Sequence, residues 1–442
     1  MNKQIIQKLV ATYHDFRSDS LLHNSLYLIL GTLVMAMTGF VFWMINTRAS
    51  VPYEIGLATT LISSVTLITS ISMIGLNVSL VRFLPKTLDK NSLISSIFNA
   101  IAIVSGLAGF IFVAGLNSFA PDLIEILRSP MSVILFCLFI PLASLNMITD
   151  SVFISNGKTI YILLINTVMS IARLLLAVAL VGYGAIGIVL SFGLSICLAV
   201  GLSLYLLHRY FNFSYKRVIN KQVMQPLWKY ALGIYLSGIV SSAPTLIMPL
   251  IIAARLSPEI TAYYYMPTMI LNLLLAIPRS ATATFIAEGS RELQMLRNLA
   301  VRSIAHMYTL FIPAAIITAI FGSLVLSVFG ARYSAEGMLY LRLSLASVFI
   351  AIPGYVASSV LTVQKKIRLQ FILNLVSSLV TLLMTHFYID RGLYGLGIAA
   401  ILSQLVIAGT FTATILFSNR WLITGLQNKI QLLTSKKTLL VR

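Results

Sequence analysis

Residues Arg48–Lys86 read RASVPYEIGLATTLISSVTLITSISMIGLNVSLVRFLPK, and this stretch decides the fold class. A short polar turn precedes a run without charge from Ile55 to Val81, and Arg82-Phe-Leu-Pro-Lys86 closes the run. An uncharged, mostly apolar run of about 18 or more residues is typical of a transmembrane helix. The same plan recurs along the whole chain, so the sequence predicts an all-α membrane protein.

Composition supports this interpretation. The 442 residues are 58% hydrophobic and 10% charged, and the mean hydropathy is +0.94. Soluble domains carry about 25% charged residues, and a soluble globule with this balance would expose large apolar patches. Cys137 and Cys197 both fall in apolar runs, so we interpret them as packing residues. The polar N-terminus predicts no cleaved signal peptide.

Charge-free runs predict twelve transmembrane helices, a number consistent with an even topology. They lie near residues 25–46, 56–78, 93–116, 131–153, 160–182, 185–207, 228–253, 262–286, 303–328, 338–361, 369–388 and 393–417. Residues 1–24 and 418–442 are basic and apolar at helical spacing, which predicts amphipathic segments lying on the inner leaflet. Residues 208–227 form the widest basic gap and are expected to be a cytoplasmic linker between an N-lobe at 25–207 and a C-lobe at 228–417.

The distribution of basic residues predicts the orientation. With the N-terminus inside, 23 Lys and Arg fall on the cytoplasmic side and 6 on the outer side, and two lie within spans. Cytoplasmic loops of membrane proteins collect Lys and Arg. The bias predicts that both termini are cytoplasmic, and it explains the net charge of +19 better than binding to nucleic acid does.

Ordered matches between the halves predict an internal duplication. Arg48 with Glu54 corresponds to Arg255 with Glu259, at an offset of 207 for the arginines. A second set of matches lies at an offset of 208 and pairs Ser151, Lys158 and Asn166 with Ser359, Lys366 and Asn374. The last span of each half opens with a similar pair, Tyr183-Gly184 and Tyr394-Gly395. Two units of six spans have the same orientation and are parallel repeats around a central cleft, which suits alternating access.

Catalytic motifs are not apparent in the sequence. There is no GxxxxGK[ST] phosphate-binding loop and no HExxH or paired-cysteine metal pattern. The five histidines fall at predicted span ends or in the tails. We therefore expect neither an enzyme nor a bound cofactor or metal.

Two arginines within spans are the strongest candidates for a binding site. Arg173 lies in the fifth span and Arg279 follows Pro278 in the eighth, whereas the nearest acid, Asp150, is at the inner end of the fourth. A charge inside the membrane is costly, so it should face a cavity or a partner. Arginine binds phosphate oxygens bidentately. The alternative is that each arginine snorkels or bonds to backbone carbonyls.

Three further arginines and four prolines are weaker candidates. Arg48, Arg82 and Arg255 stand at span mouths, where they could contact substrate or serve only as topology charges. Pro244, Pro249, Pro267 and Pro278 interrupt spans seven and eight, and kinks are tolerated beside a cavity. We expect these two spans to be moving cleft walls, although proline is also common in ordinary membrane helices.

Several short motifs resemble a known family. They are Leu21-Leu22-His23-Asn24-Ser25, Gly56-Leu57-Ala58, Gly75-Leu76-Asn77, Val81-Arg82-Phe83-Leu84-Pro85 and Tyr394-Gly395-Leu-Gly397. The pattern is similar to the polysaccharide transporters, the oligosaccharide flippases of the multidrug/oligosaccharidyl-lipid/polysaccharide flippase superfamily. The resemblance implies a protein that moves polyprenyl-pyrophosphate-linked oligosaccharide to the outer leaflet.

The expected function is therefore that of a flippase in the cytoplasmic membrane, for assembly of surface polysaccharide, O-antigen or glycoprotein glycans. Its expected partners are the lipid-linked oligosaccharide, membrane lipids, and glycosyltransferases and a polymerase of the same pathway, and no nucleic acid. One alternative is a cation-coupled multidrug extruder of the same superfamily, which would need a membrane carboxylate. The other is a non-transporting membrane scaffold of glycan assembly.

Overall fold

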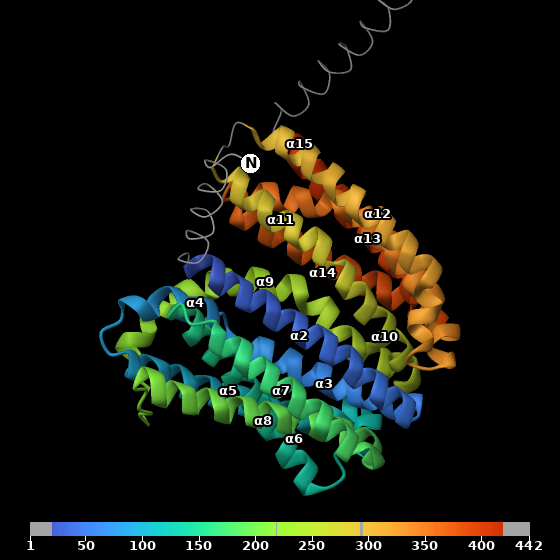
Figure 1. Ribbon diagram of the computed structural model, residues 1–442. Coiled ribbons are helices and arrows are strands. Elements are labelled where there is room, and N and C mark those ends of the chain that lie inside the picture. Colours follow the sequence, from blue (N-terminus) through green and yellow to red (C-terminus); the bar gives the residue numbers. More distant parts are fainter. Residues whose placement is uncertain (1–19, 218, 292–294, 419–442) are drawn as a thin grey trace, which may run out of the picture. The chain divides into compact units, whose positions relative to one another are not determined.

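A computed structural model describes residues 20–217, 219–291 and 295–418, and all regular structure in these ranges is helical. Most of the two predicted amphipathic ends, 1–24 and 418–442, lies outside these residues. The α-helices, in chain order, are α2 (Ser20–Ala49), α3 (Pro52–Met73), α4 (Leu76–Phe83), α5 (Lys90–Phe119), α6 (Pro130–Ser155), α7 (Ile160–Ala179), α8 (Gly184–Phe211), α9 (Lys221–Arg255), α10 (Pro258–Leu274), α11 (Ala276–Gly289), α12 (Leu296–Ser327), α13 (Ala331–Val363), α14 (Ile367–Tyr388) and α15 (Gly392–Ser418) (Figure 1).

Short 3-10 turns connect some of these helices: η1 (Leu84–Lys86), η2 (Pro121–Glu125), η3 (Val181–Tyr183) and η5 (Ile389–Arg391). Eleven stretches of the described chain are long and apolar enough to cross a membrane, and the last of them, Ile367–Phe417, contains both α14 and α15. Counting these two helices separately gives the twelve predicted spans. The predicted all-helical membrane fold is thereby confirmed.

Local sequence explains where several helices begin. Pro52 and Pro130 occupy the first turns of α3 and α6, where the missing N–H of proline costs no helical hydrogen bond. The side chain of Ser129 accepts from the Ser132 N–H at 3.0 Å and caps α6. The carboxylate of Asp89 caps α5 in the same way, accepting from the Ser92 N–H at 2.9 Å. Such caps satisfy N–H groups that have no intrahelical partner.

The chain divides into two compact units, and each is described by itself. Unit 1 comprises 1–239 with 245–262, and unit 2 comprises 240–244 with 263–442. Most of α9 thus packs with unit 1. Leu227 and Ala231, in the first half of α9, are buried in the same hydrophobic core as residues of α4, α5, α6, α7 and α8. The predicted division into lobes at 25–207 and 228–417 stays a prediction.

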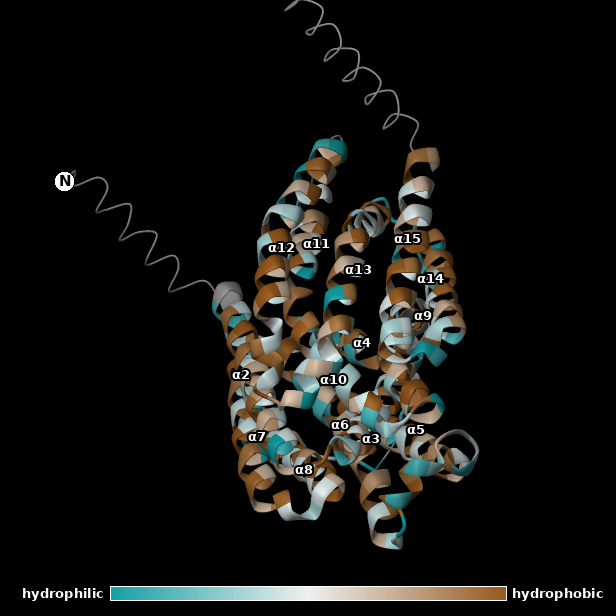
Figure 2. Cartoon of the chain, turned by 90° about the vertical axis from the view of Figure 1, so that its right-hand side faces the viewer, coloured by the Kyte–Doolittle hydropathy of each residue, from teal (hydrophilic) through white to brown (hydrophobic). Residues whose placement is uncertain are grey.

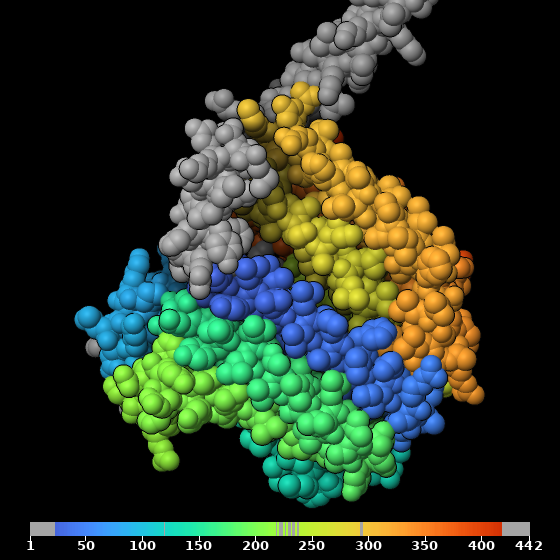
Figure 3. Space-filling model, viewed as in Figure 1, coloured from blue at the N-terminus to red at the C-terminus, as the bar shows by residue number. Residues whose placement is uncertain are grey.

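Within unit 1, α3 is the most enclosed span, and α5, α6 and α8 pack around it. α2 lies along α7, and their side chains form adjoining bands in Figure 3. In unit 2, α13 is the enclosed span and contacts α11, α12 and α15. The outer helices carry exposed apolar side chains, and Figure 2 shows many hydrophobic residues along α2 and α12. Large exposed apolar surfaces suit contact with lipid.

Backbone geometry reveals the duplication more clearly than the sequence does. Gly184 and Gly392, 208 positions apart, have φ of +58° and +63° and each follows a 3-10 turn and opens the last span of its half. Positive φ suits glycine because it has no Cβ. Three residues later, Gly187 lies against the Leu180 carbonyl and Gly395 against the Tyr388 carbonyl, and neither position has room for a Cβ. In the alignment of the two halves, Gly184 therefore corresponds to Gly392. The sequence-based pairing of Tyr183-Gly184 with Tyr394-Gly395 was wrong by three residues.

The second span, predicted as one run at 56–78, is broken. α3 ends at Met73 and α4 begins at Leu76, because Ile74 and Gly75 have φ of 43° and 72°. The break leaves carbonyls at the end of α3 without helical donors. The Tyr235 hydroxyl of α9 lies 2.8 Å from the Ser70 carbonyl oxygen and 2.6 Å from that of Ile71 and donates to them. A side chain from another helix thus satisfies the interrupted backbone, as lipid demands.

Replacing Tyr235 by Phe should destabilise the break while preserving the ring. Leaving a carbonyl without a donor away from water costs about 1–3 kcal/mol, and lipid offers no replacement, so Tyr235→Phe should lower the melting temperature of the purified protein. The matched control is Tyr205→Phe, because Tyr205 is exposed on α8 and its hydroxyl has no hydrogen bond among the described residues. Equal melting temperatures for Tyr235→Phe and wild type would contradict this account of the break.

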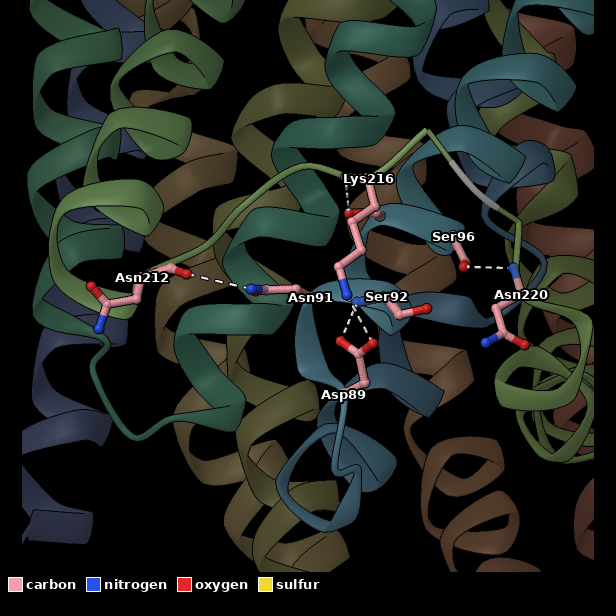
Figure 4. A network of polar contacts seen from close by, with 8 residues as sticks. Asp89, Asn91, Ser92, Ser96, Asn212, Lys216 and Asn220 are labelled. Carbon is pink, nitrogen blue, oxygen red and sulfur yellow. Dashed lines mark hydrogen bonds and ion pairs between the residues drawn. The ribbon is translucent and has the colours of Figure 1, made fainter.

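The non-helical part of the predicted linker is only residues 212–220, because α8 and α9 extend into it. This segment lies along the first turns of α5 (Figure 4). The Lys216 ammonium forms an ion pair with Asp89 at 2.9 Å. The backbone N–H groups of Lys216 and Asn220 donate to the hydroxyls of Ser95 and Ser96 at 3.0 and 2.9 Å. The linker is therefore fixed to α5 by a row of polar contacts.

The ion pair predicts an acid-dependent loss of stability. The hydrogen bond from Lys216 and the capped Ser92 N–H lower the pKa of Asp89. Its contribution is therefore fully present above the unfolded value of about 3.9 and is lost as pH falls through the lower folded pKa. Asp89→Asn should melt below wild type at pH 7, and the difference should vanish in acid.

The control is Glu336→Gln, which removes an exposed carboxylate from α13. It should leave the melting temperature close to that of wild type at every pH. A difference between Asp89→Asn and wild type that stayed constant down to strong acid would show that the Asp89 carboxylate does not act through its charge.

Candidate functional site

The eighth span is interrupted just before its arginine. α10 ends at Leu274 and α11 begins at Ala276, with Pro278 in its first turn. The ring of a proline clashes with the carbonyl four residues earlier, and that carbonyl belongs to Leu274. The backbone N–H of Arg279 bonds to Leu275 O at 3.2 Å and resumes the helix. Pro278 therefore sets the break and places Arg279 in the first turn of α11.

The guanidinium of Arg279 is exposed on unit 2 and lightly bound. Its Nη2 donates to Asn272 Oδ1 of α10 at 3.5 Å, the long limit of a hydrogen bond. Tyr355 of α13 is close enough to interact with it electrostatically. Arginine has five N–H donors, so most of them remain available. The backbone N–H groups of Leu275 and Arg279 are bonded to the Leu271 and Leu275 carbonyls at 3.0 and 3.2 Å, so the guanidinium itself supplies the free donors that suit an anion.

Tyrosines near the start of α10 pack against α13. Tyr263 meets Tyr333 edge to face with ring centroids 5.3 Å apart, and Tyr264 meets Tyr340 at 5.1 Å. Pro267 and the Tyr263 carbonyl approach α13 closely at Gly337, where a Cβ would lie 2.7 Å from the proline ring. Sequence analysis missed this contact, although the run Tyr263-Tyr264-Tyr265 was a visible signal. The α10–α13 contact fixes the helix that precedes Arg279.

Arg173 lies in unit 1 and is held by α8. Its Nε donates to the Ser195 hydroxyl at 3.2 Å, and its Cζ lies 4.5 Å from the centroid of the Phe192 ring. Cation–π contact on a desolvated ring stabilises a guanidinium. Arg173 thus bridges α7 and α8, which favours a structural role over the predicted binding role, although substrate contact is not tested.

The other predicted arginines stand at helix ends. Arg48 and Arg255 are exposed in the last turns of α2 and α9, which lead into α3 and α10. Arg82 is exposed in the last turn of α4, at the opposite end of the second span from Arg48, and its Cζ lies 5.8 Å from the Phe83 ring centroid. Within unit 1 the structure does not gather these three residues at one place.

The four predicted kink prolines differ in effect. α9 continues through Pro244 and Pro249, and α10 continues through Pro267. Only Pro278, among these four, lies at an interruption. The break in the second span, by contrast, has no proline and depends on Ile74 and Gly75. A prediction of kinks that used only the positions of prolines therefore missed the break between α3 and α4.

A buried carboxyl was underrated from sequence. Asp150 lies five residues before the end of α6, and its Oδ1 is buried without a hydrogen-bond partner in the described structure. The sequence analysis used Asp150 only as the acid nearest to the two arginines, and it did not predict that protein atoms cover this oxygen. Among the described residues, no three His, Cys, Asp or Glu side chains group closely enough to hold a metal ion.

Comparison with family models decides the relationship. Residues 21–286, more than half of the 442-residue chain, match the family described as polysaccharide biosynthesis protein. This chain belongs to the polysaccharide biosynthesis protein family. The resemblance seen in the short motifs is thereby confirmed. A comparison with curated proteins finds no match.

Solved structures share the fold of this family member. The lipid II flippase MurJ in an inward closed conformation superposes with a TM-score of 0.70 at 14% identity, covering 89% of this chain and 87% of MurJ. An inward-facing multidrug resistance MATE transporter of the MOP superfamily gives 0.65 at 13% identity, covering 91% and 99%. A MOP superfamily transporter from Pyrococcus furiosus, described as having a binding pocket of reverse polarity, gives 0.60 at 13% identity, covering 91% and 96%.

The Arg173–Phe192 contact can be measured by a double-mutant cycle of Arg173→Met and Phe192→Leu. The coupling energy should be about 0.5–2 kcal/mol, the range for cation–π pairs from exposed to desolvated sites, and it is read from unfolding of the purified protein. The control pair is Arg209 and Tyr210, where Cζ lies 5.8 Å from the ring centroid and both residues are exposed. A coupling no larger than in the control would show that the Phe192 ring does not hold Arg173.

Proposed function

We propose that this protein is a flippase that moves a polyprenyl-(pyro)phosphate-linked oligosaccharide across the cytoplasmic membrane by alternating access. The observation that carries the proposal is Arg279, a lightly bound arginine next to Pro278 in the eighth span, in a member of the polysaccharide biosynthesis family. Arginine is suited to phosphate. A relative of the same fold, MurJ, is a flippase of lipid II.

In this proposal the pyrophosphate binds at the guanidinium of Arg279. Two phosphate oxygens can accept from its N–H groups bidentately, while Asn272 offers an amide for sugar hydroxyls or for orienting the arginine. The polyprenyl chain stays in lipid, because removing its apolar surface from the bilayer gains nothing. Arg48, Arg82, Arg173 and Arg255 are proposed as further contacts along the route of the headgroup.

The proposed movement is a rocking of an N-lobe, 25–207, against a C-lobe, 228–417, joined by the basic linker 208–227. Pro244, Pro249, Pro267 and Pro278 belong to the two spans proposed as moving cleft walls. Both termini are placed in the cytoplasm, so the head would enter from the inner leaflet. Glycosyltransferases and a polymerase of the same pathway would supply and consume the substrate. No chemical step is required of the protein.

Removal of the guanidinium should stop export without unfolding the protein. Hydrogen bonds to charged groups contribute about 1.5–3 kcal/mol, so Arg279→Ala should reduce surface glycan by roughly ten- to hundredfold, whereas Arg279→Lys should keep part of the activity. Arg302→Ala on α12 is the control, because Arg302 is also exposed. Glycan is measured on the cell surface, and insertion by membrane fractionation.

Two results would contradict the proposal. Full export by a normally inserted Arg279→Ala protein would remove Arg279 from the site. A deletion strain with normal surface glycan and increased sensitivity to cationic drugs would favour the multidrug extruder instead.

A further inference from the structure

A small apolar cavity lies in unit 1 between the starts of α6 and α8, and its volume is about 180 Å³. Phe136 and Phe139 line it and are only 1% and 2% exposed. The Phe139 ring lies against Gly193 of α8, where a Cβ would have no room. Met131 and Ile186 also line the cavity but are exposed, so they stand at its mouth. The cavity therefore runs from the surface of unit 1 down to two buried rings.

The polar groups of the lining are already satisfied. The lining hydroxyls belong to Ser129 and Ser132. The Ser132 hydroxyl donates to the Ser129 carbonyl at 2.8 Å, and the Ser129 hydroxyl donates to Ser132 Oγ at 3.0 Å. An occupant would gain no hydrogen bond from these groups, so the cavity suits an apolar one. A cavity of about 150 Å³ lined by Leu, Ile and Phe stays dry and binds benzene, so this cavity has room for part of a hydrocarbon chain.

One wall of the cavity is the turn that follows η2, and it is fixed without any ligand. Ile126 and Leu127 line the cavity and are buried. The Leu127 N–H donates to the Leu123 carbonyl at 3.3 Å. The hydroxyl of Tyr53 on α3 donates to Glu125 Oε2 at 3.1 Å. Binding to a preformed wall requires little ordering of the protein.

The mouth of the cavity adjoins an apolar surface of α6. Met131, Ile134 and Leu138 are exposed and share one helix face. The lining residues of α6 extend from Met131 to Phe139, which is about 12 Å at 1.5 Å per residue. Large exposed apolar surfaces of a membrane protein suit contact with lipid chains. A cavity that is long in the direction of the helix and opens on such a surface fits a single chain.

A cation stands beside this cavity, at the beginning of the span. Arg128 is exposed and lies between two lining residues of the turn. The two acids of η2 lie near α3 instead: Glu125 accepts from the Tyr53 hydroxyl, and Asp122 interacts electrostatically with the same group. Arginine is suited to phosphate oxygens, and the phosphates of phospholipids lie at the level where membrane spans begin. Charge and apolar lining thus match the two parts of one lipid.

We propose that this cavity binds one acyl chain of an anionic phospholipid whose phosphate pairs with Arg128. The predicted topology puts this end of α6 on the outer side, so the lipid belongs to the outer leaflet. A lipid bound there contacts η2, α6 and α8 together and stabilises unit 1 by mass action. The site is distinct from Arg279, and its occupancy does not rest on the proposed transport function.

Photolabelling of the full chain tests the site directly. The protein is reconstituted in phosphatidylcholine vesicles that contain a minor fraction of phosphatidylglycerol with a diazirine on its acyl chain, and the labelled peptides are located by mass spectrometry. The label should lie on the starts of α6 and α8. The same diazirine carried by phosphatidylcholine should label these peptides less, because its headgroup has no net negative charge.

Filling the cavity should remove the label. Leu190→Trp adds bulk inside the cavity, and its matched control is Leu198→Trp, because Leu198 is exposed two turns further along α8 and does not line the cavity. The control should keep the wild-type label. If Leu190→Trp does not fold, Ile186→Trp serves instead, because it adds bulk at the exposed mouth and should also reduce the label.

Removal of the cation tests the headgroup contact. Arg128→Gln should weaken labelling by phosphatidylglycerol up to about fivefold, the effect of losing an exposed ion pair, and leave labelling by phosphatidylcholine unchanged. The matched control is Arg332→Gln, which removes another exposed arginine from the start of a span, α13, and should leave both labels unchanged.

Three results would overturn the proposal. The first is an equal label in wild type and in the filled variants, which would show that no chain enters the cavity. The second is equal labelling by phosphatidylcholine and phosphatidylglycerol, which would show that the headgroup charge has no role. The third is displacement of the label by unlabelled polyprenyl phosphate but not by unlabelled phosphatidylglycerol, which would assign the cavity to an isoprenoid chain.

Discussion

The fold depends on one constraint: lipid offers no hydrogen bonds, so the backbone must satisfy its own polar groups or obtain partners from neighbouring helices. Long uninterrupted helices meet this constraint over most of the described chain. The second span departs from it at Ile74 and Gly75, where the Tyr235 hydroxyl serves the freed carbonyls. The eighth span keeps helical dihedrals at Leu275, where the helix turns before Pro278 and the arginine that we propose binds the headgroup.

The same cost governs charged side chains, and the two arginines within spans meet it differently. Arg173 obtains a hydroxyl and an aromatic ring from α8 and has become part of the packing of unit 1. Arg279 has one long hydrogen bond to Asn272 and remains exposed on unit 2. The presence of both arginines within predicted spans therefore did not reveal that their surroundings differ. An arginine already held by its neighbours is poorly suited to release them for a ligand, whereas Arg279 has donors to offer.

Hydropathy was sufficient to predict the class of fold and the number of spans, because uncharged runs longer than a bilayer have no other stable environment. It could not predict the break at Gly75, since the run from Ile55 to Val81 stays apolar across it. The partners of Arg173 could not be predicted either, because Phe192 and Ser195 look like ordinary residues of an apolar span. Asp150 was visible as an acid in an uncharged run, but its burial depends on how α6 faces α8. Contacts between helices distant in sequence decide such features.

The docked connection between the halves has a mechanical consequence. The segment contacts α5 at Lys216 and Asn220, through Ser95, Ser96 and Asp89, so these two residues move with α5 as long as the contacts hold. A displacement of the chain beyond Lys221 must then deform helical segments or break the contacts between the linker and α5. The free energy of these polar contacts therefore contributes to the free energy of any large conformational change that separates the segment from α5.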